Sequence, residues 1–260
     1  MCRDEMPRIR EIIAAVEKCG CSGHYFENFD NSLLENPIKR KHFLHLETEL
    51  AELDCAAWSQ LKEQVVPLFM KKDPVRGWQS AFDKLNQAKA YKYLAMLGCR
   101  EVGFIPESSI PGKKTPDLGG RLGGTSILCE VKTINPSDEE ANARGRMIAR
   151  SIQGDLPEAF FNKLSSTVDK ANTQMDSYCQ DRASRRFVYV VLNFDDNLHE
   201  YVDRYMQQVE NFCRQTELPR VGLIFDVKPA FYYATTKSAT SSWFIWSEER
   251  TWKGPATLPH

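Results

Sequence analysis

The sequence predicts an α/β protein in which helices flank a central mixed β-sheet, preceded by a helical amino-terminal region. Two observations lead to this fold class. Segments with the three-to-four-residue apolar spacing of helices alternate with short apolar runs typical of strands. The run FVYVVLNF, residues 187–194, is rich in β-branched and aromatic residues, as in a buried central strand. After residue 78 the predicted order is helix, three strands, helix, strand, helix and strand.

The amino-terminal region is predicted to be helical over residues 4–18 and 41–70, where apolar side chains recur every three or four positions. Pro67 and the KKDPVRG stretch at 71–77 interrupt this pattern. The amino-terminal region could recognise a target, mediate formation of a homodimer or only cover the sheet. The predicted domains are this helical region, 1–75, and an α/β domain, 76–260.

The α/β domain is predicted to open with a helix over residues 78–97, which Gly98 can end. Proline and glycine signals then separate short segments with strand character. The sequence GGRLGG, residues 119–124, is predicted to turn the second strand back into the third. The three predicted strands cover residues 100–106, 114–118 and 125–133.

The second half of this domain is predicted to alternate between helices and strands. Residues 136–157 are polar, which is typical of a loop or an irregular helix. A long helix follows, because apolar side chains from Phe160 to Met175 share one face. The remaining predicted elements are helices over 158–182 and 199–216 and strands over 187–194 and 221–226.

Composition limits the partners of this chain. It has 34 Lys and Arg residues against 35 Asp and Glu residues, so binding to nucleic acid needs a local basic surface. A solvated surface is the alternative for each candidate cluster. No apolar run approaches the about 20 residues that span a bilayer, and no signal peptide is apparent, so we expect a cytoplasmic protein. The two clusters are Arg144, Arg146 and Arg150, and Arg182, Arg185 and Arg186.

The stretch TPDLGGRLGGTSILCEVKTIN, residues 115–135, places charges on an otherwise apolar strand. Glu130 and Lys132 share one face, because side chains two apart on a strand point the same way. They could form an exposed ion pair worth no more than about 1 kcal/mol. With Asp117 they could instead form a Mg²⁺ site, since Mg²⁺ prefers carboxylate oxygens and a nearby lysine can stabilise an anion. The second alternative requires the hairpin to bring Asp117 beside Glu130.

These motifs resemble a known family. Pro-Asp at 116–117 followed by Glu-Val-Lys at 130–132 resembles the signature of the PD-(D/E)XK nuclease superfamily, whose restriction-endonuclease-like core has the same order of helices and strands. Gln174 and Tyr178 resemble the Gln-x3-Tyr motif of its RecB and lambda-exonuclease-like branch. The resemblance covers residues 78–226.

The resemblance implies a role for each of these residues. Asp117 and Glu130 would bind Mg²⁺, with Mn²⁺ as an alternative ion. Lys132 would position or activate the attacking water. Gln174 and Tyr178 would orient the site or the substrate strand, although residues four apart on a helix are also neighbours for purely structural reasons.

Two departures from the family pattern affect the first helix and the loop after the third strand. Many members of this branch carry an acid on the first helix, where this chain has Asp83 and Gln87. Gln87 could replace that acid as a metal ligand, Asp83 could serve, or both could lie on a plain exposed face. Residues 136–157 would form an insertion beside the site. Its arginines could grip a phosphate backbone: Arg144, Arg146 and Arg150.

The expected function is a Mg²⁺-dependent nuclease that hydrolyses phosphodiester bonds in nucleic acid, with DNA favoured over RNA. The resemblance implies roles in restriction, repair or phage defence. One alternative is a catalytically inactive nuclease-fold protein that binds nucleic acid or acts as an assembly protein. Another is a small-molecule enzyme on a different α/β fold, although the sequence has no nucleophile elbow or dinucleotide fingerprint.

Overall fold

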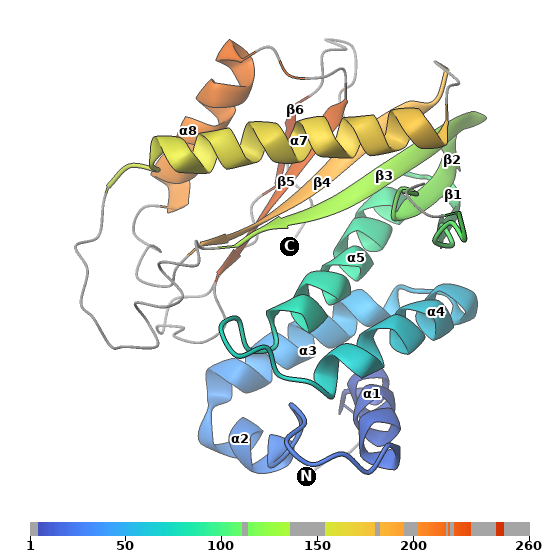
Figure 1. Cartoon of the computed structure of the whole chain (residues 1–260), viewed down its shortest axis with the longest axis vertical. Coiled ribbons are helices and arrows are strands. Elements are labelled where there is room, and N and C mark those ends of the chain that lie inside the picture. The colour runs from blue at the N-terminus through green and yellow to red at the C-terminus, as the bar shows by residue number, and fades with distance from the viewer. Residues whose placement is uncertain are drawn as a thin grey trace. The chain divides into compact units, whose positions relative to one another are not determined.

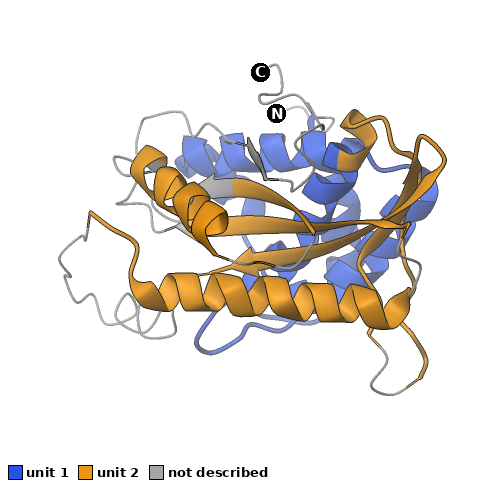
Figure 2. Ribbon diagram, turned by 90° about the horizontal axis from the view of Figure 1, so that it is seen from above, with its two compact units in different colours: residues 1–93, 137–147 blue, residues 94–136, 148–260 orange. Residues whose placement is uncertain are grey.

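The computed structural model describes residues 5–110, 114–135, 154–179, 183–194, 202–216, 218, 221–229 and 243–246. The chain separates into two compact units, which Figure 2 colours differently. Described residues up to Tyr93 belong to the first unit, and those from Leu94 onward belong to the second. The domain boundary at residue 75 stays a prediction.

Helices form the first unit (Figure 1). The last of them, α5, begins in the first unit and ends in the second. The helices are α1 (Pro7–Lys18), α2 (Phe29–Glu35), α3 (Pro37–Ala51), α4 (Cys55–Val65), the short 3-10 helix η2 (Val66–Phe69) and α5 (Gln79–Met96).

The single helix predicted over residues 41–70 is wrong, because the chain forms two helices and a 3-10 turn there. Asn36 caps α3 by accepting from the backbone amides of Ile38 and Lys39. Asp54 caps α4 by accepting from the amide of Ala57 at 2.8 Å. A capping side chain starts a new helix, and the apolar periodicity alone does not register this interruption.

The core of the first unit is aromatic. The ring centroid of Tyr25 lies 5.2 Å from Phe69, 5.4 Å from Phe82 and 5.7 Å from Trp78. Ring pairs at these distances stabilise a core beyond the area that they bury. The leucines of the predicted apolar stripe are also buried, as expected: Leu46, Leu50, Leu53 and Leu61.

A buried carboxylate holds the start of α1. Glu47, on α3, is 5 % exposed and accepts from the backbone amides of Arg8 and Ile9, both at 2.9 Å. These amides belong to the first turn of α1, where they have no partner within the helix. Burial raises the pKa of the Glu47 carboxyl. The interaction therefore links α3 to the amino terminus of α1.

The second unit contains a mixed sheet, in agreement with the predicted α/β class. The described strands form one six-stranded sheet in the order β1-β2-β3-β4-β5-β6. Pairs β3–β4 and β4–β5 are parallel, and the other neighbouring pairs are antiparallel. The strands are β1 (Arg100–Phe104), β2 (Leu118–Leu122), β3 (Thr125–Ile134), β4 (Arg185–Phe194), β5 (Gly222–Pro229) and β6 (Trp243–Trp246), the last of which was not predicted.

Two helices pack on one face of this sheet: α7 (Glu158–Tyr178) and α8 (Val202–Gln215). Figure 1 shows α7 running along the sheet. The predicted apolar face of α7 is buried, and it packs with side chains of β3, β4, β5 and α8 in one core. The members contributed by α7 are Leu164, Val168, Ala171 and Met175.

The hairpin between β2 and β3 differs from the prediction. Only Gly123 and Gly124 form the turn, with φ angles of 55° and 85°. Positive φ at both central residues is characteristic of a type I′ turn, which favours glycine. The first four residues of GGRLGG therefore lie in β2, and Leu118 pairs with Cys129. One step further, this register places Asp117 opposite Glu130.

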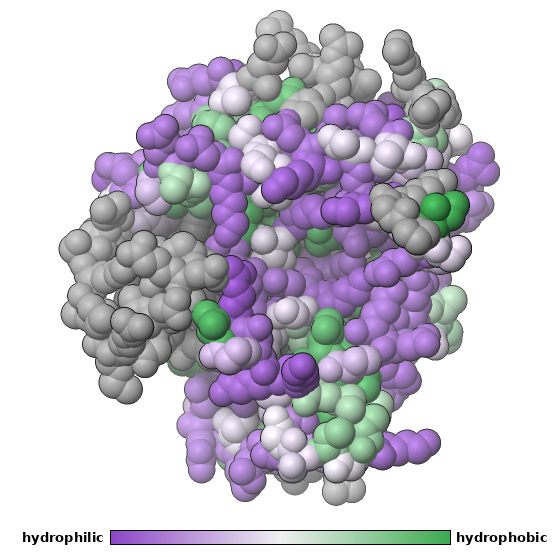
Figure 3. Space-filling view, in the orientation of Figure 1, coloured by the Kyte–Doolittle hydropathy of each residue, from purple (hydrophilic) through white to green (hydrophobic). Residues whose placement is uncertain are grey.

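No helix among the described residues is long and apolar enough to cross a membrane. Hydrophilic residues dominate the described part of the surface seen in Figure 3, with green apolar areas between them. The large apolar side chains that are exposed come from different elements: Leu34, Val75, Met96, Ile110 and Tyr178.

Candidate functional site

Asp117 lies directly before β2 and is held between β1 and β3. Its backbone carbonyl accepts from the amide of Ile105 at 3.0 Å. Its carboxylate oxygen Oδ2 accepts from the amide of Val131 at 2.8 Å. The side chain is half-buried. These contacts fix the carboxylate at the edge of β3, where the register of the hairpin predicts it.

Glu130 lies in the middle of β3 and is 2 % exposed. It shares a face with Leu128, which belongs to the core beneath α7. Its oxygen Oε1 accepts from Nζ of Lys132, and Oε2 accepts from Nε2 of Gln174 at 2.9 Å. The ion pair that the sequence left as an alternative is therefore present. Its carboxylate is buried, however, whereas the side chain of Lys132 is 30 % exposed.

The environment of Glu130 raises its pKa to about 7. The largest cause is burial, which disfavours the charged carboxylate, and the second is repulsion by the charge of Asp117. Lys132 and the backbone amide of Asp117 act in the opposite direction. Two carboxylates thus lie close together in a site that favours an additional positive charge.

Gln174 connects α7 with the two segments that carry the carboxylates. Its Nε2 donates to Oε2 of Glu130 and, at 2.6 Å, to the backbone carbonyl of Thr115, two residues before Asp117. One amide group therefore contacts the carboxylate on β3 and the chain that leads into β2. This arrangement positions Glu130 and Asp117 relative to each other.

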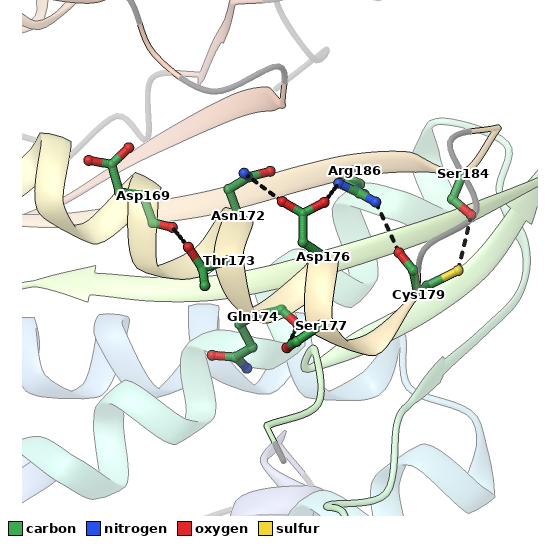
Figure 4. A network of polar contacts seen from close by, with 9 residues as sticks. All are labelled: Asp169, Asn172, Thr173, Gln174, Asp176, Ser177, Cys179, Ser184 and Arg186. Atoms are coloured by element: carbon green, nitrogen blue, oxygen red, sulfur yellow. Dashed lines mark hydrogen bonds and ion pairs between the residues drawn. The ribbon is translucent and has the colours of Figure 1, made fainter. Parts of the chain in front are cut away.

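The carboxyl-terminal end of α7 is attached to the start of β4 by a polar network (Figure 4). Arg186 forms an ion pair with Asp176 and donates to the backbone carbonyl of Cys179 at 3.0 Å. A cation at this end of a helix satisfies a terminal carbonyl and opposes the helix dipole. Figure 4 shows that Asp176 projects toward Arg186, whereas Gln174 projects away from it. Arg186, which the sequence placed in a basic cluster, thus joins the end of α7 to the start of β4.

Tyr178 is the second residue of the predicted Gln-x3-Tyr motif. Tyr178, one turn after Gln174, is 38 % exposed, and among the described residues no hydrogen bond joins it to Asp117, Glu130 or Lys132. Its predicted part in the site stays a prediction.

Gln87 and Asp83 lie on the part of α5 that belongs to the first unit. Gln87 is 6 % exposed and Asp83 is half-buried, so neither belongs to the plain exposed face that was one alternative. The ligand role of Gln87 stays a prediction. The arginines predicted to grip phosphate lie outside the described residues: Arg144, Arg146 and Arg150.

The donor set at Asp117 and Glu130 fits Mg²⁺. In the described part of the chain no group of three or more His, Cys, Asp or Glu side chains could hold a metal ion. Mg²⁺ does not require such a cage, because it keeps several waters and is commonly held by one or two carboxylates. Mutual repulsion between the two acids provides a reason for a cation to bind there.

Sequence reasoning missed three features of the site and its surroundings. The Thr115 carbonyl has no residue-type signal, and Arg186 resembles any surface arginine. The buried position of Glu130 could not be recognised because it depends on α7, whose Gln174 is 44 positions away. Only the Gln-x3-Tyr motif gave a sequence signal for this side of the site.

No family model, curated protein or solved structure matches the chain. The function of the protein is therefore inferred from its own residues and their geometry. The features that bear on function are the paired carboxylates, the lysine beside them and the glutamine that contacts the buried acid.

Proposed function

We propose that this protein is a Mg²⁺-dependent nuclease that hydrolyses phosphodiester bonds, with DNA as the favoured substrate. The observation that carries the proposal is the proximity of Asp117 to the buried Glu130, with Lys132 bonded to the Glu130 carboxylate. A buried acid beside a half-buried one and a partly exposed lysine is costly for folding, and pKa values are commonly perturbed in this way at functional sites.

Asp117 and Glu130 would hold the metal in this proposal. A bound Mg²⁺ would neutralise charge on the phosphate and lower the pKa of a water. Lys132 has a side chain that is 30 % exposed, so its ammonium group can reach a substrate while it remains beside Glu130. A cation held there can orient the attacking water or stabilise the negative charge that develops during hydrolysis.

Gln174 would act as a positioning residue. It donates both to the Glu130 carboxylate and to the Thr115 carbonyl, so it limits rotation of the acid and movement of the chain before Asp117. Groups that orient metal ligands in this way commonly affect metal affinity or activity by about 10- to 100-fold.

The topology supports the same proposal. The chain forms the helix α5, then an antiparallel meander of the three strands β1 to β3, then the helix α7. Strand β4 follows and pairs parallel to β3. This order is that of the restriction-endonuclease-like core, and we propose that the second unit, with α5, has that fold. The site would then lie on β2 and β3, as in the sequence motif.

The test is cleavage of labelled single-stranded and duplex DNA and RNA in the presence of Mg²⁺, Mn²⁺ or EDTA. Wild type is compared with Glu130→Gln and Lys132→Ala. Matched controls are Asp203→Asn on α8 and Lys170→Ala on α7, since both residues are exposed. We expect metal-dependent cleavage by wild type and both controls, and its loss in the two site variants while they remain folded.

Folded wild type that cuts none of these substrates, and whose thermal stability does not respond to Mg²⁺ or Mn²⁺, would contradict the proposal. Binding to nucleic acid without cleavage would instead favour the catalytically inactive alternative. Cleavage that survives both site substitutions would place the chemistry elsewhere in the chain.

A further inference from the structure

Two arginines lie directly opposite each other at the edge of the sheet. Arg100, the first residue of β1, pairs with Arg121 of β2, and both side chains are exposed. Like charges in directly opposed positions destabilise a sheet. Within the described residues neither guanidinium has a hydrogen-bond or ion-pair partner. Two positive charges therefore lie side by side with no partner among the described residues.

A β-bulge creates this pairing. Gly103 pairs with Gly119, and Phe104 with Leu118, but the register shifts between Gly103 and Arg100. If the register continued without the shift, Glu101 would lie opposite Arg121, and the two would form an attractive pair. The bulge instead removes Glu101 from the ladder and brings Arg100 opposite Arg121.

The bulge carries a conformational cost as well. Glu101 has a φ angle of 54°, which lies in the left-handed region that residues with a Cβ atom rarely adopt. Bulges commonly re-aim a side chain next to a functional site. Here the bulge at the strained Glu101 forms the repulsive pair Arg100–Arg121 in place of an attractive pair between Glu101 and Arg121. A bound anion would offset the repulsion between the two guanidinium groups.

The arginine pair lies on the same face of the sheet as the proposed catalytic acids. Arg121 pairs with Ser126, which shares a face with Leu128 and Glu130 by strand alternation. Arg121 and Asp117 are four residues apart along the chain, which corresponds to about 13 Å in an extended strand. A nucleic-acid strand has one phosphate per about 3.4 Å of duplex axis. The pair is thus a few nucleotides from the carboxylates.

We infer that Arg100 and Arg121 bind a backbone phosphate of the nucleic acid that the proposed nuclease site cleaves. Guanidinium groups suit this role because their planar donors match phosphate oxygens in pairs. A local cation pair is also what a chain with a net charge of −1 needs to hold a polyanion. This inference rests on the proposed function and adds a substrate-binding subsite to it.

The test measures binding of short fluorescein-labelled single-stranded and duplex DNA by anisotropy over a series of salt concentrations. Lys132→Ala serves as the background, so that cleavage does not consume the probe. Arg100→Ala, Arg121→Ala and the double variant are compared with Arg214→Ala, a control on α8 whose guanidinium is also exposed. Loss of this phosphate contact in the double variant should reduce the salt-dependence slope for duplex DNA by about 0.9, which is about eightfold in Kd at 0.1 M salt.

A further variant separates binding from folding. Arg121→Glu would place an acid opposite Arg100 and make the pair attractive, so its melting temperature should be equal to or higher than that of the background. Its DNA affinity should nevertheless fall at least as much as that of Arg121→Ala. A structural role for the arginine would not raise stability while lowering affinity.

Two results would overturn the inference in distinguishable ways. If the background binds DNA and wild type cleaves it, but the arginine variants keep the same Kd and salt slope, the subsite is wrong and the proposed nuclease function stands. If wild type neither cleaves nor binds nucleic acid, the proposed function and the subsite fail together.

Discussion

Replacement of Glu130 by glutamine should stabilise the metal-free protein while abolishing cleavage. The substitution keeps the size of the side chain and one oxygen that can accept from Gln174, but it removes the charge that lies beside Asp117. Glu130 is buried, and its pKa rises from 4.5 to about 7. The folded protein therefore holds this carboxyl in an environment that disfavours its ionised form.

The direction of the effect follows from that pKa. Between about pH 4.5 and pH 7 the folded state binds more protons at Glu130 than the unfolded state does, so stability falls as pH rises. A difference of about 2.5 pKa units, at about 1.4 kcal/mol each, amounts to about 3 kcal/mol above pH 7. The favourable contact with Lys132 is already included in this difference, because Lys132 lowers the pKa that results. The expected gain is therefore about 3 kcal/mol at pH 8 and close to zero at pH 4.

Denaturant unfolding of wild type and Glu130→Gln over this pH range, first in EDTA and then in Mg²⁺, measures the effect. Asp203→Asn is the control for loss of an exposed acid. Mg²⁺ should stabilise wild type and reduce the difference, because the cation replaces the missing positive charge. Equal stabilities at every pH, or a variant that is less stable at pH 8, would refute the assignment of Glu130 as a buried, repelled carboxylate.

Three further predictions test contacts that the structure places around the site and in the first unit. Gln174→Ala should lower cleavage by about 10- to 100-fold and unfolding free energy by about 1–2 kcal/mol, because Glu130 loses its amide donor; steady-state kinetics and denaturant unfolding measure the two effects. Glu47→Ala should cost about 1–3 kcal/mol in denaturant unfolding at pH 7, since two amides of α1 lose their acceptor, and Glu47→Gln should cost less. Gly222→Ala should lower the melting temperature, because a Cβ at that position would lie 2.6 Å from the ring of Phe187 and overpacking costs about 1–3 kcal/mol. An unchanged value in any of these measurements would contradict the corresponding contact.

Much of the second unit could be predicted because its elements have strong local signals. The apolar stripe of α7 has a helical periodicity that is visible in the sequence, and β4 is a continuous run rich in β-branched residues. The structure buries both of these apolar segments. The first unit was predicted less accurately. The leucine spacing continues across the break between α3 and α4, where only the capping contact of Asp54 decides that a new helix begins.

At the candidate site, too, the sequence predicted the residue types and the structure decided how they are placed. The types and spacing of Asp117, Glu130 and Lys132 indicated metal chemistry, but their proximity required a two-residue turn at Gly123 and Gly124. A turn longer by one residue would change the register and place the side chains on opposite faces of their strands. Such a difference is not visible in the apolar pattern of either strand.

By itself, the sequence determined the α/β class, the amphipathic faces of the principal helices and the residue types available for chemistry, because these depend on properties of neighbouring residues. Tertiary structure alone decided that Glu130 is buried, that Gln174 bonds to it and that a bulge at Glu101 pairs two arginines. Burial, strand register and charge repulsion are free energies of contacts between segments far apart in the chain. No local pattern records which of those contacts form.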